Sequence, residues 1–294
     1  MLLSSYYLTE RVWYTCVGDV MNTILDEISE FFENALRICS SNKWRKAKIS
    51  EEDIRVLYRL NGYCAMLSQT VLQMTLNDIV WECEILMRTI SEGTIKLLYI
   101  CGDTNTIGEK IQQYSEELSD YSINKDSTRA MTYVEKVEGL DDVHKHTYLT
   151  LDKFTVDLEK TRKERKQTEQ RWSFLEMLNQ IEKMSMPFVD KITALAYGYG
   201  LSSHFVHADF EAIGLIWDRI NREEKEQELL HNAHKSRFMG DMLTMALARA
   251  WILNKNGEGD IEEYKKLAIS FNELMKKILA LSEPWNDYYR EHYM

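Results

Sequence analysis

Residues 12–38 read VWYTCVGDVMNTILDEISEFFENALRI, and this stretch decides the fold class. Apolar side chains recur in it every three or four residues, which is the spacing of one face of an α-helix. The residues of that face are Val12, Cys16, Val20, Ile24, Ile28, Phe31, Ala35 and Ile38. The spacing predicts one long amphipathic helix that ends near residues 39–42.

The same period recurs along most of the chain. Ser50, with Asp53 three residues later, resembles a capping box and predicts the start of a second helix. Pro284 is expected to stop the last helix, because proline cannot continue a helix interior. The helices after the first are expected over about 50–72, 76–101, 151–183, 188–217, 239–254 and 260–281.

Composition supports an all-α fold. The 294 residues include only 2 prolines and 12 glycines, so few residues interrupt helices, and no β-type alternation or sustained heptad occurs. We predict one helical domain over 1–294, a single multi-helix bundle whose core spans 50–220. Residues 109–170 have the weakest pattern and are predicted to form an insertion or a mobile segment.

Charge and cysteine content restrict the class of protein. The formal net charge of −11 opposes a general affinity for nucleic acid, because the mean field repels phosphates. No apolar run reaches about 18 residues and the first residues lack a signal-peptide pattern, so neither a membrane span nor secretion is expected. The five cysteines form no CxxC motif and are interpreted as reduced core residues, which favours a cytoplasmic protein.

Arg88 and Glu92 form the first candidate site. At positions i and i+4 of the third predicted helix they share a face and are expected to form an ion pair. Their apolar neighbours on that face are Trp81, Ile85, Ile95 and Tyr99, so the pair is predicted to be buried. Because a buried ion pair is costly, it indicates either a functional site or a structural lock between helices.

A second candidate group lies on the helix predicted around residue 200. Tyr199, Ser203 and His207 follow one another at intervals of four residues, so they share a helix face. His207 could act as an acid or a base near neutral pH, and Ser203 could act as a nucleophile if a base reaches it. The alternative is a core serine bonded to a carbonyl and a histidine held by a structural partner.

His204, His207 and Glu211 could together offer metal ligands, although another helix would have to complete the shell. A di-iron bundle needs two Glu-x-x-His motifs on different helices, and only Glu228–His231 has this form. No phosphate-binding glycine loop and no HExxH motif occurs. We therefore expect no cofactor and no metal.

Two stretches carry a family resemblance. Residues 84–100 read EILMRTISEGTIKLLYI, and residues 199–207 read YGLSSHFVH. They resemble an uncharacterised family of helical bacterial proteins in which R-x-x-x-E is followed much later by Y-x-x-L-S-x-x-x-x-H, although in this chain one residue instead of two separates Tyr199 from Leu201. The resemblance covers about 50–220, and that family is in turn distantly similar to the HEPN group.

The HEPN resemblance implies a helical bundle with a polar site between the arginine helix and the histidine helix. HEPN proteins are frequent in bacterial antiviral defence and toxin systems, and many cleave RNA. HEPN ribonucleases typically carry an arginine and, after four to six residues, a histidine on the same helix. This chain lacks that spacing, so Arg88 and His207 would have to meet through space.

Our leading hypothesis is a defence- or toxin-type effector with metal-independent, RNase-like activity. Arg88, Glu92, Ser203 and His207 are its predicted catalytic residues, and Tyr199, His204 and Glu211 are predicted binding residues. RNA would be the substrate, and a sensor or antitoxin protein and a second copy of the chain are candidate partners. The alternatives are a non-catalytic sensor or adaptor that binds a protein, and a metal-dependent hydrolase.

Overall fold

The structure, a computed structural model, describes residues 15–40, 43–44, 49–119, 162–184 and 186–294, and the single positions 122, 132 and 136. Within these ranges every regular element is a helix, and no strand occurs. The prediction of an all-α, multi-helix bundle is therefore confirmed. Most of the segment 109–170, predicted to be an insertion or mobile, lies outside the described residues.

The described helices follow one another in the order α1 (Thr15–Ser40), α2 (Glu51–Leu76), α3 (Cys83–Cys101), α4 (Ile107–Gln112), the π-helix η1 (Gln113–Glu117), α7 (Arg162–Arg171), α8 (Phe174–Glu182), α9 (Val189–His207), α10 (Phe210–Ile220), α11 (Glu224–Asn256), α12 (Ile261–Ala280) and α13 (Glu283–Tyr293). None of the helices in the described ranges has an apolar run that would cross a membrane.

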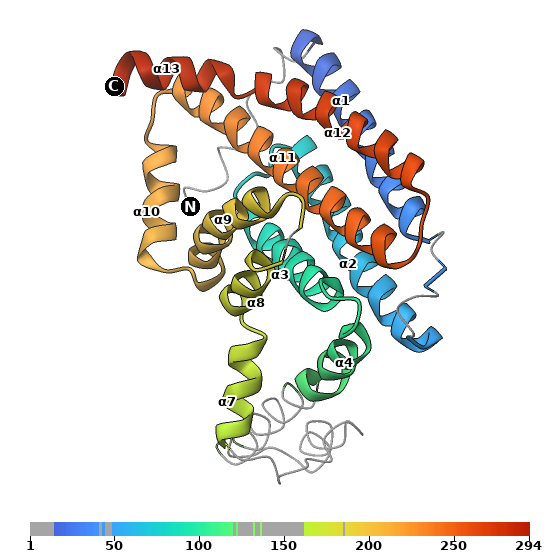
Figure 1. Ribbon diagram of the computed structural model, residues 1–294. Coiled ribbons are helices and arrows are strands. Elements are labelled where there is room, and N and C mark those ends of the chain that lie inside the picture. Colours follow the sequence, from blue (N-terminus) through green and yellow to red (C-terminus); the bar gives the residue numbers. More distant parts are fainter. Residues whose placement is uncertain are drawn as a thin grey trace, which may run out of the picture.

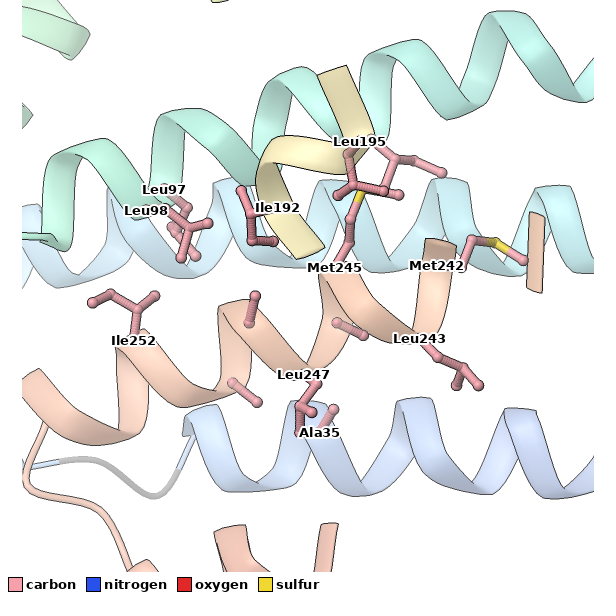
Figure 2. Close-up of a cluster of buried hydrophobic side chains, with 14 of the residues drawn as sticks. Ala35, Leu97, Leu98, Ile192, Leu195, Met242, Leu243, Met245, Leu247 and Ile252 are labelled. Atoms are coloured by element: carbon pink, nitrogen blue, oxygen red, sulfur yellow. The ribbon is translucent and has the colours of Figure 1, made fainter. Parts of the chain in front are cut away.

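Helix α11 forms the centre of the bundle (Figure 1). It packs against α1 and α12 and also against α3 and α9. In Figure 2, Met245 of α11 points toward Leu195 of α9, and Leu247 points toward Ala35 of α1. Because α11 contributes apolar side chains in several directions, it holds the α3–α9 part of the bundle to the α1–α12 part.

Four cysteines lie in this core. Cys39, Cys64, Cys83 and Cys101 are buried and unpaired. Burial raises the pKa of Cys39 and of Cys101 to about 12, so both thiols stay protonated at neutral pH. For these four residues the prediction of reduced core cysteines is confirmed.

The predicted start of the third helix is wrong. Helix α2 continues to Leu76, and α3 begins only at Cys83. Between them Asp78 adopts a left-handed conformation with φ 59°, which asparagine and aspartate tolerate better than most residues. Trp81 therefore lies in the turn before α3 and not on its helical face.

Two segments predicted as continuous are broken by N-caps. The expected helix 151–183 divides at Ser173, whose hydroxyl accepts a hydrogen bond from the Glu176 amide and starts α8. The stripe 188–217 divides at Asp209, whose carboxylate accepts hydrogen bonds from two amides and starts α10. Gly198 and Gly200, which could have interrupted this stripe because glycine weakens a helix interior, lie inside α9.

The C-terminal region is more helical than predicted. The charged stretch 222–236, expected to separate two helices, forms part of the 33-residue helix α11. The helix predicted over 260–281 is α12, which ends at Ala280 before Pro284 as expected, but the residues after it form a further helix, α13, with Pro284 in its first turn. Proline suits this position because the first helical amides have no acceptor within the helix.

The predicted cap at Ser50 is present in full. Its hydroxyl accepts a hydrogen bond from the Asp53 amide at 3.1 Å, and the Asp53 carboxylate accepts one from the Ser50 amide at 2.9 Å. We expect Ser50→Ala to lower the free energy of unfolding by about 1 kcal/mol in urea titrations. Ser50→Thr keeps the hydroxyl, so its free energy of unfolding should fall much less. An equal decrease for the two variants would contradict the capping role of Ser50.

Candidate functional site

Arg88 on α3 reaches across to α9. Its Nη1 donates a hydrogen bond to Ser203 Oγ at 3.0 Å, and its Nη2 donates one to the Tyr199 hydroxyl at 3.3 Å. The Arg88 Cζ atom also lies 4.9 Å from the centroid of the Tyr199 ring. The structure therefore brings together the arginine of the first candidate group and two residues of the second.

Helix α8 helps to position Tyr199. The ring of buried Phe174 stacks on the Tyr199 ring with centroids 3.7 Å apart and an angle of 6° between the planes. Stacking restricts the orientation of the Tyr199 ring and therefore fixes the position of its hydroxyl. Tyr199 thus orients the Arg88 guanidinium from one side while Ser203 binds it from another.

Glu92 does not pair with Arg88, so the predicted ion pair is wrong. Glu92 binds Lys96 instead, with Nζ 2.6 Å from Oε1. The predicted burial was also too high, because Arg88 and Glu92 are half-buried and Ile85 on the same face is 44% exposed. No carboxylate of the described residues lies within ion-pair distance of Arg88, so within that part of the chain its charge has no direct counter-ion.

His207 is the last residue of α9 and is exposed. It lies one helical turn beyond Ser203 on the same face. His204 has a structural partner, because its Nδ1 lies 2.7 Å from Oδ2 of Asp209, the N-cap of α10. The hydrogen bond to His204 is the main reason why the pKa of Asp209 lies below its usual value.

The predicted metal-ligand group does not converge. Glu211 is exposed on the first turn of α10, and His204 is bound to Asp209. Within the described ranges, no three His, Cys, Asp or Glu side chains are placed together as a metal site requires.

Glu84, which the sequence reasoning missed, is the fully buried acid of this region. Its Oε2 accepts a hydrogen bond from Ser202 Oγ at 2.7 Å, and its Oε1 forms an ion pair with Arg237 of α11. Glu84 lies one turn before Arg88, and Ser202 precedes Ser203 in the sequence. Two consecutive serines of α9 therefore dock on two successive turns of α3.

Two further basic side chains pack around Trp81, in the turn before α3. Arg219 of α10 is buried with its Cζ 4.0 Å from the Trp81 ring centroid, and burial lowers its pKa to about 10. His234 of α11 packs edge-on against the same ring at 5.0 Å. Burial, reinforced by nearby Arg219 and Arg237, lowers the pKa of His234 to about 3, so this histidine is neutral at neutral pH.

Arg237 also connects this buried cluster to a pocket of about 450 Å³ between α9, α11 and α12, which Ser282 in the turn after α12 also lines. Its Nη1 lies 4.0 Å from Oδ2 of Asp241, which lines the same pocket. Burial raises the pKa of Asp241 to about 6. Glu84, Arg237 and Asp241 thus form a chain of charges from the core to the pocket wall.

Only part of this cluster could have been predicted from the sequence. The i, i+4 relation of Glu84 to Arg88 places both on one row of the helix, so Glu84 could have been proposed. Arg237 could not, because it lies 153 residues from Glu84 and in a stretch rich in charged residues.

The chain is similar to one known family. Residues 54–228, more than half of the chain, match the family described as "Family of unknown function (DUF5677)". No curated protein and no solved structure matches the chain significantly. The matched segment includes α3, α8, α9 and α10, and so contains Arg88, Ser203 and His207. The chain therefore belongs to the DUF5677 family, whose function is unknown.

Proposed function

We propose that this protein is a defence- or toxin-type effector that cleaves RNA without a metal, at a site formed by Arg88, Ser203 and His207. The main support for this proposal is the environment of the Arg88 guanidinium. Arg88 is half-buried, two hydroxyls orient its guanidinium, and it has no counter-ion among the described residues. Of the five N–H donors of an arginine, two are used here, so three can bind a phosphate. The distant HEPN resemblance of the two motifs supports the same chemistry.

In the proposed reaction the ribose 2′-oxygen attacks the adjacent phosphorus while the bond from phosphorus to the 5′-oxygen breaks. His207 takes the proton of the 2′-hydroxyl as general base, and water supplies the proton to the leaving 5′-oxygen. Arg88 stabilises the negative charge that grows on the phosphate oxygens. Ser203 and Tyr199 position Arg88, whereas Glu92 has no role because it pairs with Lys96.

Cleavage of single-stranded RNA by the purified full chain tests this proposal. We expect His207→Ala to reduce the rate at least about 100-fold, because a positioned acid–base group contributes roughly that much or more. Arg88→Lys should also be strongly impaired, because an ammonium cannot reproduce the planar, multidentate donors of a guanidinium.

His292→Ala is the matched control, since His292 is an exposed histidine on α13. It should cleave RNA at the wild-type rate. A wild-type protein that cleaves no RNA, or a His207→Ala variant that retains full activity with an unchanged fold, would contradict the proposal.

A second candidate function, a non-catalytic adaptor that binds a protein partner, is favoured by one observation. Helix α10 lies at the edge of the bundle (Figure 1) and exposes Phe210 by 85% and Trp217 by 67%. Large apolar side chains that project together into solvent often mark an interaction site. An adaptor would lose its function on substitutions in α10 and not on His207→Ala.

A further inference from the structure

The outer face of α10 is an apolar stripe. Phe210, Ile213, Trp217 and Ile220 follow one another at helical spacing and are exposed by 85%, 56%, 67% and 53%. The opposite face is anchored in the bundle through buried Ala212 and Arg219. We call the four exposed residues the α10 stripe.

The α10 stripe is larger than isolated apolar residues on a surface would explain. An aromatic side chain buries roughly 150–250 Å² when fully covered, so the exposed parts of Phe210 and Trp217 alone offer about 230–380 Å². The largest apolar patch of a typical monomer is about 300–600 Å² and is often functional. The two isoleucines extend the area along one side of a helix.

Acidic residues border the α10 stripe. Glu211 and Asp218 lie seven residues apart on one flank of α10 and are both exposed, and exposed Glu223 and Glu224 follow the helix. Residues 209–224 contain five acidic and two basic side chains. Of the two basic ones, Arg219 is buried and Arg222 is already paired with Asp218 and Glu226.

We propose that the α10 stripe is the docking surface for an amphipathic helix of a partner protein that carries lysine or arginine beside its apolar residues. The apolar face of such a helix would cover Phe210 and Trp217, and its basic flank would meet Glu211 and Asp218. A second copy of this chain fits less well, because it would bring the same acidic face to the interface. This inference rests on the second candidate function and is independent of RNA cleavage.

Two synthetic helical peptides with identical leucine stripes test the surface, one flanked by lysines and one by glutamates. The full chain should bind the lysine peptide at least tenfold more tightly than the glutamate peptide by fluorescence anisotropy. The double variant Phe210→Ser, Trp217→Ser should lose at least tenfold in affinity with an unchanged melting temperature. Glu211→Lys should weaken binding of the lysine peptide several-fold.

Leu175→Ser is the matched control, because Leu175 is a 64% exposed apolar residue on α8. It should bind the lysine peptide as the wild type does. Equal binding of both peptides, or of neither, would overturn the proposal. So would a dimer in sedimentation that the double variant dissociates, or binding to phosphatidylcholine vesicles that depends on Trp217, since these outcomes identify a second copy or a membrane as the occupant.

The outcome of the peptide test does not depend on that of the RNA test. Loss of peptide binding leaves the cleavage proposal at Arg88 and His207 intact. An RNA-inactive protein that binds the lysine peptide through α10 would leave the adaptor as the function.

Discussion

Replacement of Glu84 by glutamine is expected to lower the free energy of unfolding by about 3–5 kcal/mol, because it removes one partner of a buried ion pair. Glu84 is fully buried and paired with Arg237, and Arg219 lies within its field. The neutral amide can still form hydrogen bonds, but the fully buried negative charge beside Arg237 and Arg219 is lost, and Arg237 is left with its longer contact of 4.0 Å to Asp241. Urea titration at pH 7 measures the loss.

Two variants make this result specific. Glu82→Gln removes the same charge from an exposed position two residues away and should change the stability by less than about 0.5 kcal/mol. The double variant Glu84→Gln, Arg237→Gln should recover part of the loss, because the uncompensated charge of Arg237 is then absent. If the free energy of unfolding of Glu84→Gln lies within about 1 kcal/mol of the wild-type value, the Glu84–Arg237 ion pair does not stabilise the fold as proposed.

Replacement of Asp241 by asparagine is expected to stabilise the protein at neutral pH by about 1–3 kcal/mol. Burial raises the pKa of Asp241 to about 6, Arg237 opposes this effect, and Glu84 reinforces it. In an unfolded chain an aspartate has a pKa of about 3.9. The folded protein therefore binds this proton more tightly, and the wild type loses stability as the pH rises from about 4 through 6.

Melting temperatures of the two proteins between pH 4 and pH 8 check this prediction. The curves should coincide near pH 4, separate up to about pH 6 and then stay apart by a constant amount. Asp26→Asn, at an exposed position of α1, should show no such divergence, and a gap that is constant at all pH values would contradict the titration of Asp241.

The candidate site shows how far helical periodicity can predict contacts. The spacing of Tyr199, Ser203 and His207 placed them on one helix face, and the structure brings two of them to Arg88. The same reasoning failed for Glu92, because Arg88 and Lys96 are both one turn away and periodicity cannot choose between them. The choice depends on α9, which supplies hydroxyls to Arg88.

The sequence by itself determined the all-α class, the capping box at Ser50 and the burial of four of the five cysteines. These features depend on the spacing of polar and apolar residues within a short segment, and this spacing can be read without knowing which segments pack together. The sequence also contained the breaks at Ser173 and Asp209, because serine and aspartate are favoured N-cap residues, although the cap hydrogen bonds are known only from the structure.

Only the tertiary structure decided which charges meet. Glu84 and Arg237 are 153 residues apart, and Arg88 and Ser203 are 115 residues apart. The contacts exist because α9 and α11 both pack on α3, and such packing follows from the summed burial of many apolar side chains. The tertiary structure also left the α10 stripe uncovered, since a helix pattern shows an apolar face but not whether another element lies against it.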